Sequence, residues 1–150
     1  MTNTAPLLSE LYLEDETAWL DAMAELIASG AYAELDYSNL REYLTDMAIR
    51  DRREVESRLF VLMMHILKWV HQPGHRSGSW KGSIIVQRAE LKRHAGRGVL
   101  RKHAESVLAD VYQESVEAAA EETGLPLETF PSECPYTFDD VLTFKTDAAD

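Results

Sequence analysis

The sequence has little cysteine and no long apolar run, and both absences narrow the classes of protein that it can encode. Cys134 is the only cysteine in 150 residues, which excludes an intramolecular disulfide and a zinc site built from several thiolates. No apolar run approaches the ~18 residues that a membrane-spanning helix needs, and the N-terminal residues lack the basic start and apolar core of a signal peptide. We therefore expect a cytoplasmic protein that is neither secreted nor embedded in a membrane.

The sequence also lacks the short motifs that carry common chemistries. It contains no glycine-rich phosphate loop, no serine-nucleophile elbow and no zinc-protease helix. No glutamate is followed three residues later by a histidine, which is the spacing that holds di-iron centres in helical bundles. We therefore expect neither a metal ion nor another cofactor, and the sequence leaves open whether the protein is an enzyme.

Charge is unevenly distributed along the chain, whose formal net charge is -11. Residues 1–75 hold thirteen acidic against six basic side chains, and residues 104–150 hold twelve against one. Between them, residues 76–103 hold eight basic side chains and a single acid, Glu90. The overall negative charge disfavours nonspecific attraction to nucleic acid or anionic lipid. The basic middle segment instead suits an acidic partner, within this chain or in a second copy.

Apolar side chains recur at helical spacing through most of the chain. Asp15 is placed to cap a helix that Gly30 ends, and Asp36 is placed to cap a second helix that meets no glycine or proline between residues 37 and 71. This stretch is either one long helix or two helices with a bend near Asp51. Ten of the twelve residues 59–70 are apolar, so we expect this helix to be central and covered by several neighbours.

Two further helices and an irregular tail complete the predicted fold. Ser77 or Ser79 is placed to cap a helix that runs to about residue 95, and the next helix, residues 99–123, ends at Gly124. Prolines at 126, 131 and 135 predict an extended strap over the bundle, anchored by Leu125, Leu127, Phe130, Tyr136 and Phe138. The predicted fold class is all-α: a single-domain helical bundle of residues 1–150 with long central helices, ordered from about residue 7 to 144 and frayed at both ends.

Polar side chains cross the most apolar helix at a seven-residue interval. With their neighbours they form a candidate set of Arg58, His65, Lys68, Gln72, Arg76 and Arg88. A cation aimed at apolar neighbours needs a partner, because an uncompensated charge in the interior costs several kcal/mol. There are therefore two alternatives. The set is an ion-paired network, which fixes either helix register or an oligomer contact, or it lines a pocket for an anionic ligand.

Two other groups of side chains are weaker candidates. Glu114, Glu117 and Glu121 can bind Mg²⁺ from one helical face, as in helical nucleotide pyrophosphatases, although a carboxylate run late in a helix is usually a solvated face. The basic residues between 88 and 102 can contact the phosphates of a nucleic acid. Because acidic helices of the same chain supply nearer partners, neutralisation within the chain or between subunits is the expected use of these cations.

The chain resembles the bacterial family known as domain of unknown function 29, over about residues 11 to 142. The resemblance is most specific around the long helix and the helix after it, where it rests on Ser57, Arg58, Leu59, His65, Leu67, Lys68, Trp69, Gln72, Pro73, Arg76, Ser79, Trp80, Ile84 and Arg88. Further matches near the two ends include Tyr12, Asp15, Trp19, Gly124, Pro126, Phe130, Cys134 and Pro135. The resemblance implies a helical fold and supplies no activity, cofactor or catalytic residue.

The favoured function is that of a cytoplasmic interaction or regulatory module that forms a homo-oligomer or binds another protein. In this interpretation the candidate set organises the core or an interface. The alternative is a small helical enzyme that binds an anionic substrate at the cluster of Arg58, His65, Lys68, Gln72 and Arg88. A third hypothesis is nucleic-acid binding through residues 88–102. An open pocket beside the candidate set favours the enzyme, whereas occlusion by helices or by a second subunit favours the module.

Overall fold

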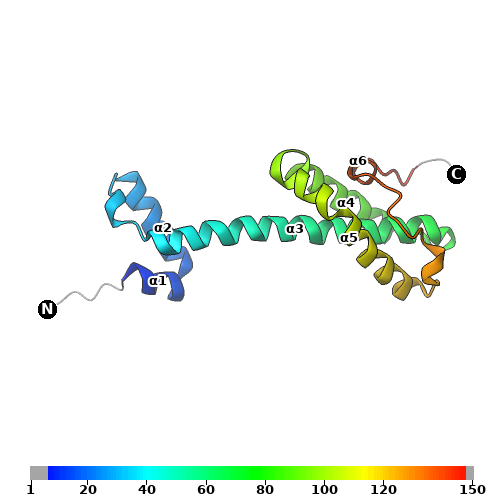
Figure 1. Cartoon of the computed structure of the whole chain (residues 1–150), viewed down its shortest axis with the longest axis horizontal. Helices are drawn as coiled ribbons and strands as arrows, with labels where there is room; N and C mark the ends of the chain where they lie inside the picture. The colour runs from blue at the N-terminus through cyan, green and yellow to red at the C-terminus, as the bar shows by residue number, and fades with distance from the viewer. Residues whose placement is uncertain (1–6, 148–150) are drawn as a thin grey trace. The chain divides into compact units, whose positions relative to one another are not determined.

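The computed structural model describes residues 7–147, and every regular element in that range is helical (Figure 1). The α-helices are α1 (Leu8–Glu14), α2 (Glu16–Ala28), α3 (Tyr37–His71), α4 (Gly78–Ala95), α5 (Gly98–Thr123) and α6 (Phe138–Leu142), with short 3-10 turns at Tyr32–Glu34, Pro73–His75 and Leu127–Thr129. The predicted all-α fold class is confirmed. None of the helices in residues 7–147 combines the length and the apolar character that crossing a bilayer requires.

The chain packs into two compact units, the first ending at Ile49 and the second beginning at Arg50. α1, α2 and the first part of α3 belong to the first unit, and the rest of α3 with α4, α5 and α6 belongs to the second. Of the two alternatives that the sequence left open for residues 37–71, the single helix is confirmed. That residues 1–150 fold as a single domain stays a prediction.

Trp19 is the centre of the first unit. Its side chain is fully buried, and its indole Nε1 donates a hydrogen bond to Oδ2 of Asp36 at 3.2 Å. Because Asp36 stands immediately before α3, this bond ties α2 to the start of α3. The rings of Tyr12 and Tyr43 pack against the indole, with centroids 4.7 and 5.9 Å away. One tryptophan thus links all three helices of this unit.

Local side-chain chemistry sets the helix boundaries, largely as the sequence predicts. The Asp15 carboxylate accepts a hydrogen bond from the backbone N–H three residues later and caps α2. Ser77, rather than Ser79, caps α4 by accepting from the backbone N–H of Trp80 at 3.2 Å. Gly124 follows α5 with φ 73, in the left-handed region that glycine adopts without strain.

α3 runs through the core of the second unit. Six of its side chains are fully buried: Val55, Leu59, Leu62, Met63, Ile66 and Leu67. The prediction that residues 59–70 form a central helix is therefore confirmed. One side of this segment is less covered, because Phe60, Val61 and Met64 are only half-buried. The neighbouring helices cover most of the apolar surface of this segment and leave the strip partly open to solvent.

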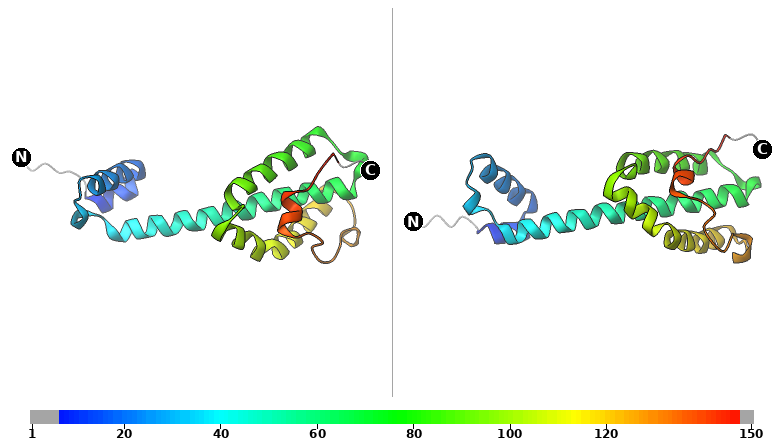
Figure 2. Two further views of the ribbon diagram at one scale, coloured as in Figure 1. Left: turned by 90° about the horizontal axis from the view of Figure 1, so that it is seen from above. Right: turned by 45° about the horizontal axis from the view of Figure 1, so that its top comes forward.

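The C-terminal strap, residues 125–147, closes over the second unit, and its helix α6 lies against α4 and α5 (Figure 2). Phe130 and Phe138 are buried in it, as predicted. The prediction that Leu127 is an anchor is wrong, since this residue, the first of a 3-10 turn, is 54% exposed. Val141 and Leu142 of α6 supply the missing apolar contacts.

A buried tyrosine fastens the strap to α5. Tyr112 is fully buried, and its hydroxyl donates a hydrogen bond to the backbone oxygen of Pro131 at 2.6 Å. One residue further along α5, the Gln113 side chain donates to the backbone oxygen of Ser132 at 2.9 Å. Burial raises the pKa of Tyr112 to about 12. The phenol therefore stays protonated and keeps its role as a hydrogen-bond donor at neutral pH.

Candidate functional site

Arg58 of the candidate set is neutralised by side chains of its own unit. Its Nε lies 3.0 Å from Oε1 of Glu54, its Nη1 donates to Gln87 at 3.2 Å, and its Nη2 lies 3.9 Å from Oε2 of Glu90. The Arg58 side chain is 29% exposed. Two carboxylates and an amide thus surround the guanidinium, which joins α3 to α4 and is not fully buried.

Glu90, the single acid of the basic segment, lies close to three basic side chains. Besides Arg58, its carboxylate lies 2.9 Å from Arg93 and 3.3 Å from the Nε2 of His94. A small hollow of about 100 Å³ lies beside this network, lined by Asp51, Glu54, Val55, Arg58, Leu91, His94 and Leu100. Because two carboxylates line it next to the guanidinium, the hollow offers an anion little net positive charge.

Lys68 and Gln72 meet the end of α5. The Lys68 Nζ lies 2.6 Å from Oε2 of Glu122 and 4.7 Å from the centroid of the Trp80 ring. The Lys68 side chain is buried, which makes it the most buried cation of the candidate set. Gln72 donates a hydrogen bond from Nε2 to the backbone oxygen of Thr123 at 3.3 Å. These two polar side chains fasten the last turns of α3 to the last turn of α5.

The other members of the set have different partners. An Arg88 guanidinium nitrogen donates to the backbone oxygen of Phe144 and holds the strap. Arg76 donates from Nε to the backbone oxygen of Trp69 at 2.9 Å, and its guanidinium stacks 4.9 Å from the centre of that ring. His65 donates from Nδ1 to Val61 at 2.7 Å, within α3 itself.

The structure therefore brings Lys68 and Gln72 together and gives every member of the candidate set a partner outside the set. The contacts of Arg58 with Gln87 and Glu90 join α3 to α4, those of Lys68 and Gln72 join the end of α3 to α5, and that of Arg88 joins α4 to the strap, whereas His65 bonds within α3. Among the residues that the structure describes, no three histidine, cysteine or carboxylate side chains lie close enough to hold a metal ion. Burial also raises the pKa of Cys134, so its thiol stays protonated and is a poor nucleophile.

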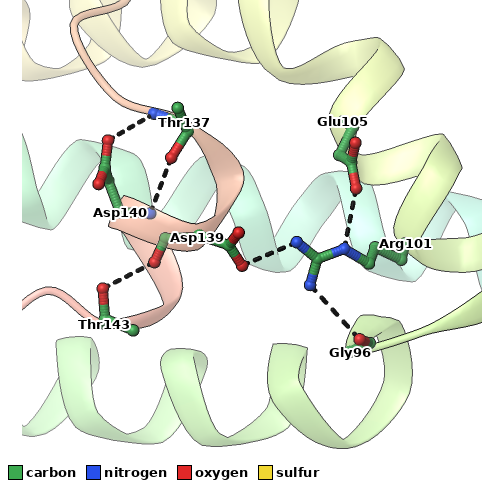
Figure 3. Close-up of polar contacts among 7 residues, drawn as sticks. All are labelled: Gly96, Arg101, Glu105, Thr137, Asp139, Asp140 and Thr143. Atoms are coloured by element: carbon green, nitrogen blue, oxygen red, sulfur yellow. Dashed lines mark hydrogen bonds and ion pairs between the residues drawn. The ribbon is translucent and has the colours of Figure 1, made fainter.

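Arg101 is a joining residue that the candidate set did not include. Its Nη2 lies 2.7 Å from Asp139 of α6, its Nε lies 2.9 Å from Glu105, and its Nη1 donates to the backbone oxygen of Gly96 at 3.4 Å (Figure 3). The hydrogen bond to Asp139 is the main reason that the pKa of Arg101 is raised. The four-residue spacing to Glu105 was visible in the sequence, whereas the approach of Asp139 depends on how the strap folds back.

The outward side of α4 carries apolar and small side chains. Ile85 is 42% exposed and Val86 is 55% exposed, and Gly82 and Ala89 lie exposed on either side of them. The exposed cations Lys92 and Arg93 follow one turn later. We call this surface, residues 82, 85, 86, 89, 92 and 93, the α4 outer face.

A groove between α3 and α5 has the opposite charge. It encloses about 310 Å³ and is lined by Glu56, Ser57, Phe60, Val61 and Glu114. The half-buried Phe60 and Val61 make it partly apolar, and Glu56 and Glu114 give it a negative rim. The Nε2 of His103 lies 3.3 Å from Glu56, although its orientation gives no hydrogen bond. We call this surface the acidic groove.

A comparison with known protein families assigns the chain to a family. A family model described as Domain of unknown function DUF29 matches residues 11–145. The chain belongs to the DUF29 family. No curated protein and no solved structure matches it. The resemblance predicted from the sequence is thus confirmed, and the match extends over both compact units of the DUF29 chain. The family description carries no activity, so the function has to be argued from the surfaces of the molecule.

Proposed function

We propose that this DUF29 protein is an interaction module that associates with a second copy of itself through the α4 outer face. The observation that carries the proposal is the exposure of Ile85 and Val86, side by side on a helix whose other side packs into the core. Contiguous exposed apolar surface next to charged residues is typical of protein–protein contacts. As part of the same proposal we place the protein in the cytoplasm, where its single thiol, Cys134, stays reduced.

Gly82 supports this proposal. A glycine in the interior of a helix costs about 1 kcal/mol relative to alanine. A Cβ added at Gly82 would meet no atom within 4 Å, so the packing of its own chain does not require a glycine there. The distance between two packed helices depends on the side chains at their contact. A glycine beside Ile85 lets a partner helix approach closely, which offsets its cost in the unpaired helix.

The partners of the candidate cations support a binding module over the alternative enzyme. An anion-binding pocket needs cationic groups that are not already neutralised. Arg58 is held by Glu54 and Glu90, and Lys68 is held by Glu122. These charges join helices, and they keep α4 in position so that its outer face is presented to a partner. Nucleic-acid binding through residues 88–102 is disfavoured by the net charge of -11.

The proposal is tested by the mass of the full chain in solution, measured by light scattering over a range of concentrations. We expect the chain to associate, and we expect Ile85→Glu to weaken association by about tenfold or more, because a charge would be buried against apolar surface. Ile27→Glu is the matched control: Ile27 is 48% exposed on α2, and the substitution changes the net charge by the same amount. A wild-type chain that stays monomeric at every concentration contradicts the proposal, as does equal weakening by both substitutions.

A further inference from the structure

We infer that the α4 outer face of one copy binds the acidic groove of a second copy, so that the chains assemble head to tail. This inference rests on the proposed function and names the partner surface. It commits to a second copy as the occupant because the two surfaces of the same chain are complementary in both apolar character and charge.

The acidic groove can receive apolar side chains. Phe60 belongs to the partly buried side chains that pack against the core, and together with Val61 it leaves apolar surface open in the groove. When a partner covers apolar surface that its own chain leaves exposed, association becomes more favourable by about 25 cal/mol for each Å² removed from water. Ile85 and Val86, which are similarly uncovered on α4, are side chains of a size that such a groove accepts.

The charges of the two surfaces are opposite. The α4 outer face ends in Lys92 and Arg93, whereas Glu56 and Glu114 border the groove. Arg93 is already paired with Glu90, so Lys92 is the cation that α4 offers to a partner.

The distance between the apolar and the charged side chains is similar on the two surfaces. At 1.5 Å per residue, Lys92 lies about 10 Å beyond Ile85 along α4. On α3, Glu56 lies about 6 Å from Phe60, and the flexible lysine side chain spans the difference.

Pairing of α4 with α4 of a second copy is the other arrangement, and charge disfavours it. An antiparallel pair centred on Ile85 brings Lys92 of one copy to the first turns of the other α4. The charged side chain there is Lys81, whose partner Asp147 already lies 2.5 Å away. Glu90, the one acid of α4, is already paired with Arg58 and Arg93 of its own chain. Such a pair offers Lys92 only carboxylates that already have cationic partners, whereas the groove supplies Glu114 as well as Glu56.

A contact between two different surfaces does not close on itself after two copies. Each copy keeps one free α4 outer face or one free groove, so assembly continues into a ring or an open chain. A self-complementary α4 contact, in contrast, stops at a dimer. The inference therefore differs from simple dimerisation in a measurable way.

The experiment uses two full-length variants, each with one surface disabled. Ile85→Glu disables the α4 outer face and keeps the groove, whereas Val61→Lys places a cation in the groove and keeps α4. Each variant alone is expected to remain monomeric by light scattering at concentrations where the wild type assembles. An equimolar mixture is expected to form heterodimers and nothing larger, because one intact face meets one intact groove and both remaining surfaces are disabled.

Two outcomes separate the failure of the inference from the failure of the proposed function. If the wild type assembles and Val61→Lys alone assembles equally well, the groove is not the partner surface, although self-association stands. If the wild type is itself monomeric, both fail. Because Val61 is half-buried and its substitution can disturb folding, Glu114→Lys serves as a second groove variant at an exposed position. It is expected to weaken assembly by about tenfold, and adding Lys92→Glu to the same chain is expected to restore it. Absence of any rescue overturns the inference.

Discussion

The ammonium of Lys68 lies 2.6 Å from the carboxylate of Glu122, and the side chain of Lys68 is 10% exposed whereas that of Glu122 is 48% exposed. The two partners thus stand in unequal surroundings, one nearly buried and one in contact with water. Removing the buried charge leaves a carboxylate that water solvates, whereas removing the exposed charge leaves an ammonium with only the Trp80 ring as compensation. The cost of breaking this ion pair therefore depends on which partner is removed.

We predict that Glu122→Gln destabilises the protein more than Lys68→Met does. Loss of the carboxylate leaves the Lys68 charge poorly compensated and is expected to cost about 1–3 kcal/mol. Met keeps the length of the Lys68 side chain and its packing on Trp80, so that its cost is expected to stay below about 1 kcal/mol. Urea unfolding of the two variants measures both costs. The opposite order would show that packing of Lys68, rather than its charge, holds α3 to α5.

The core position of α3 predicts a large effect at Leu62 and a small one at Leu127. Leu62 is fully buried, and Leu62→Ala is expected to cost about 2–5 kcal/mol through lost burial and a residual cavity. Leu127 is 54% exposed, and Leu127→Ala is expected to change stability by less than about 0.5 kcal/mol. Urea unfolding again provides the measurement, with the Leu127 variant as the matched control. A similar loss of stability in both variants would show that Leu127 anchors the strap.

Arg101 is predicted to hold α6 in place. Arg101→Gln removes the ion pairs to Asp139 and Glu105 and the contact with the Phe138 ring. If these contacts together contribute about 1 kcal/mol, the open population of the strap rises about fivefold. Limited proteolysis should then cleave residues 137–147 several times faster. Arg93→Gln is the control, since Arg93 pairs with Glu90 of its own helix, and equal acceleration in both variants would rule out a specific role for Arg101.

Tyr112 predicts a loss of stability at high pH. Burial raises its pKa from 10.0 to about 12 in the folded chain. Below pH 10 the phenol is protonated in both the folded and the unfolded state, and its contribution to stability is fully present. As the pH rises from 10 towards 12, the unfolded state loses the proton more readily, and stability falls.

Tyr112→Phe isolates this effect. The variant is less stable at neutral pH, because the hydrogen bond to Pro131 is lost and its acceptor is left unsatisfied. It is also expected to lose less stability than the wild type when the pH is raised beyond 10. Urea unfolding at a series of pH values measures the two slopes. Identical slopes would assign the alkaline loss to other groups.

Part of the candidate set could be recognised from the sequence, and part could not. Arg58 and His65 of the seven-residue pattern lie on α3, and Gln72 follows its last residue. Their partners lie far along the chain: Glu90 for Arg58 and Thr123 for Gln72. Because a sequence does not show which distant carboxylate or carbonyl meets a given cation, it left the network and the pocket as open alternatives.

The sequence by itself determined α2, α4 and α5, the cap at Asp15, the glycine that ends α5, and the family, whereas it left Ser77 and Ser79 open as caps of α4 and did not predict α6 as a helix. The features that it determined depend on local backbone chemistry and on apolar spacing within one helix, and both are determined by residues that are neighbours in the sequence. Only the tertiary structure decided that Leu127 faces solvent while Val141 and Leu142 are buried, that Arg101 reaches Asp139, and that Ile85 and Val86 stay uncovered. The physical reason is that burial depends on which distant segments fold over a residue, and a five-residue helix such as α6 is too short to leave a periodic signal of its own.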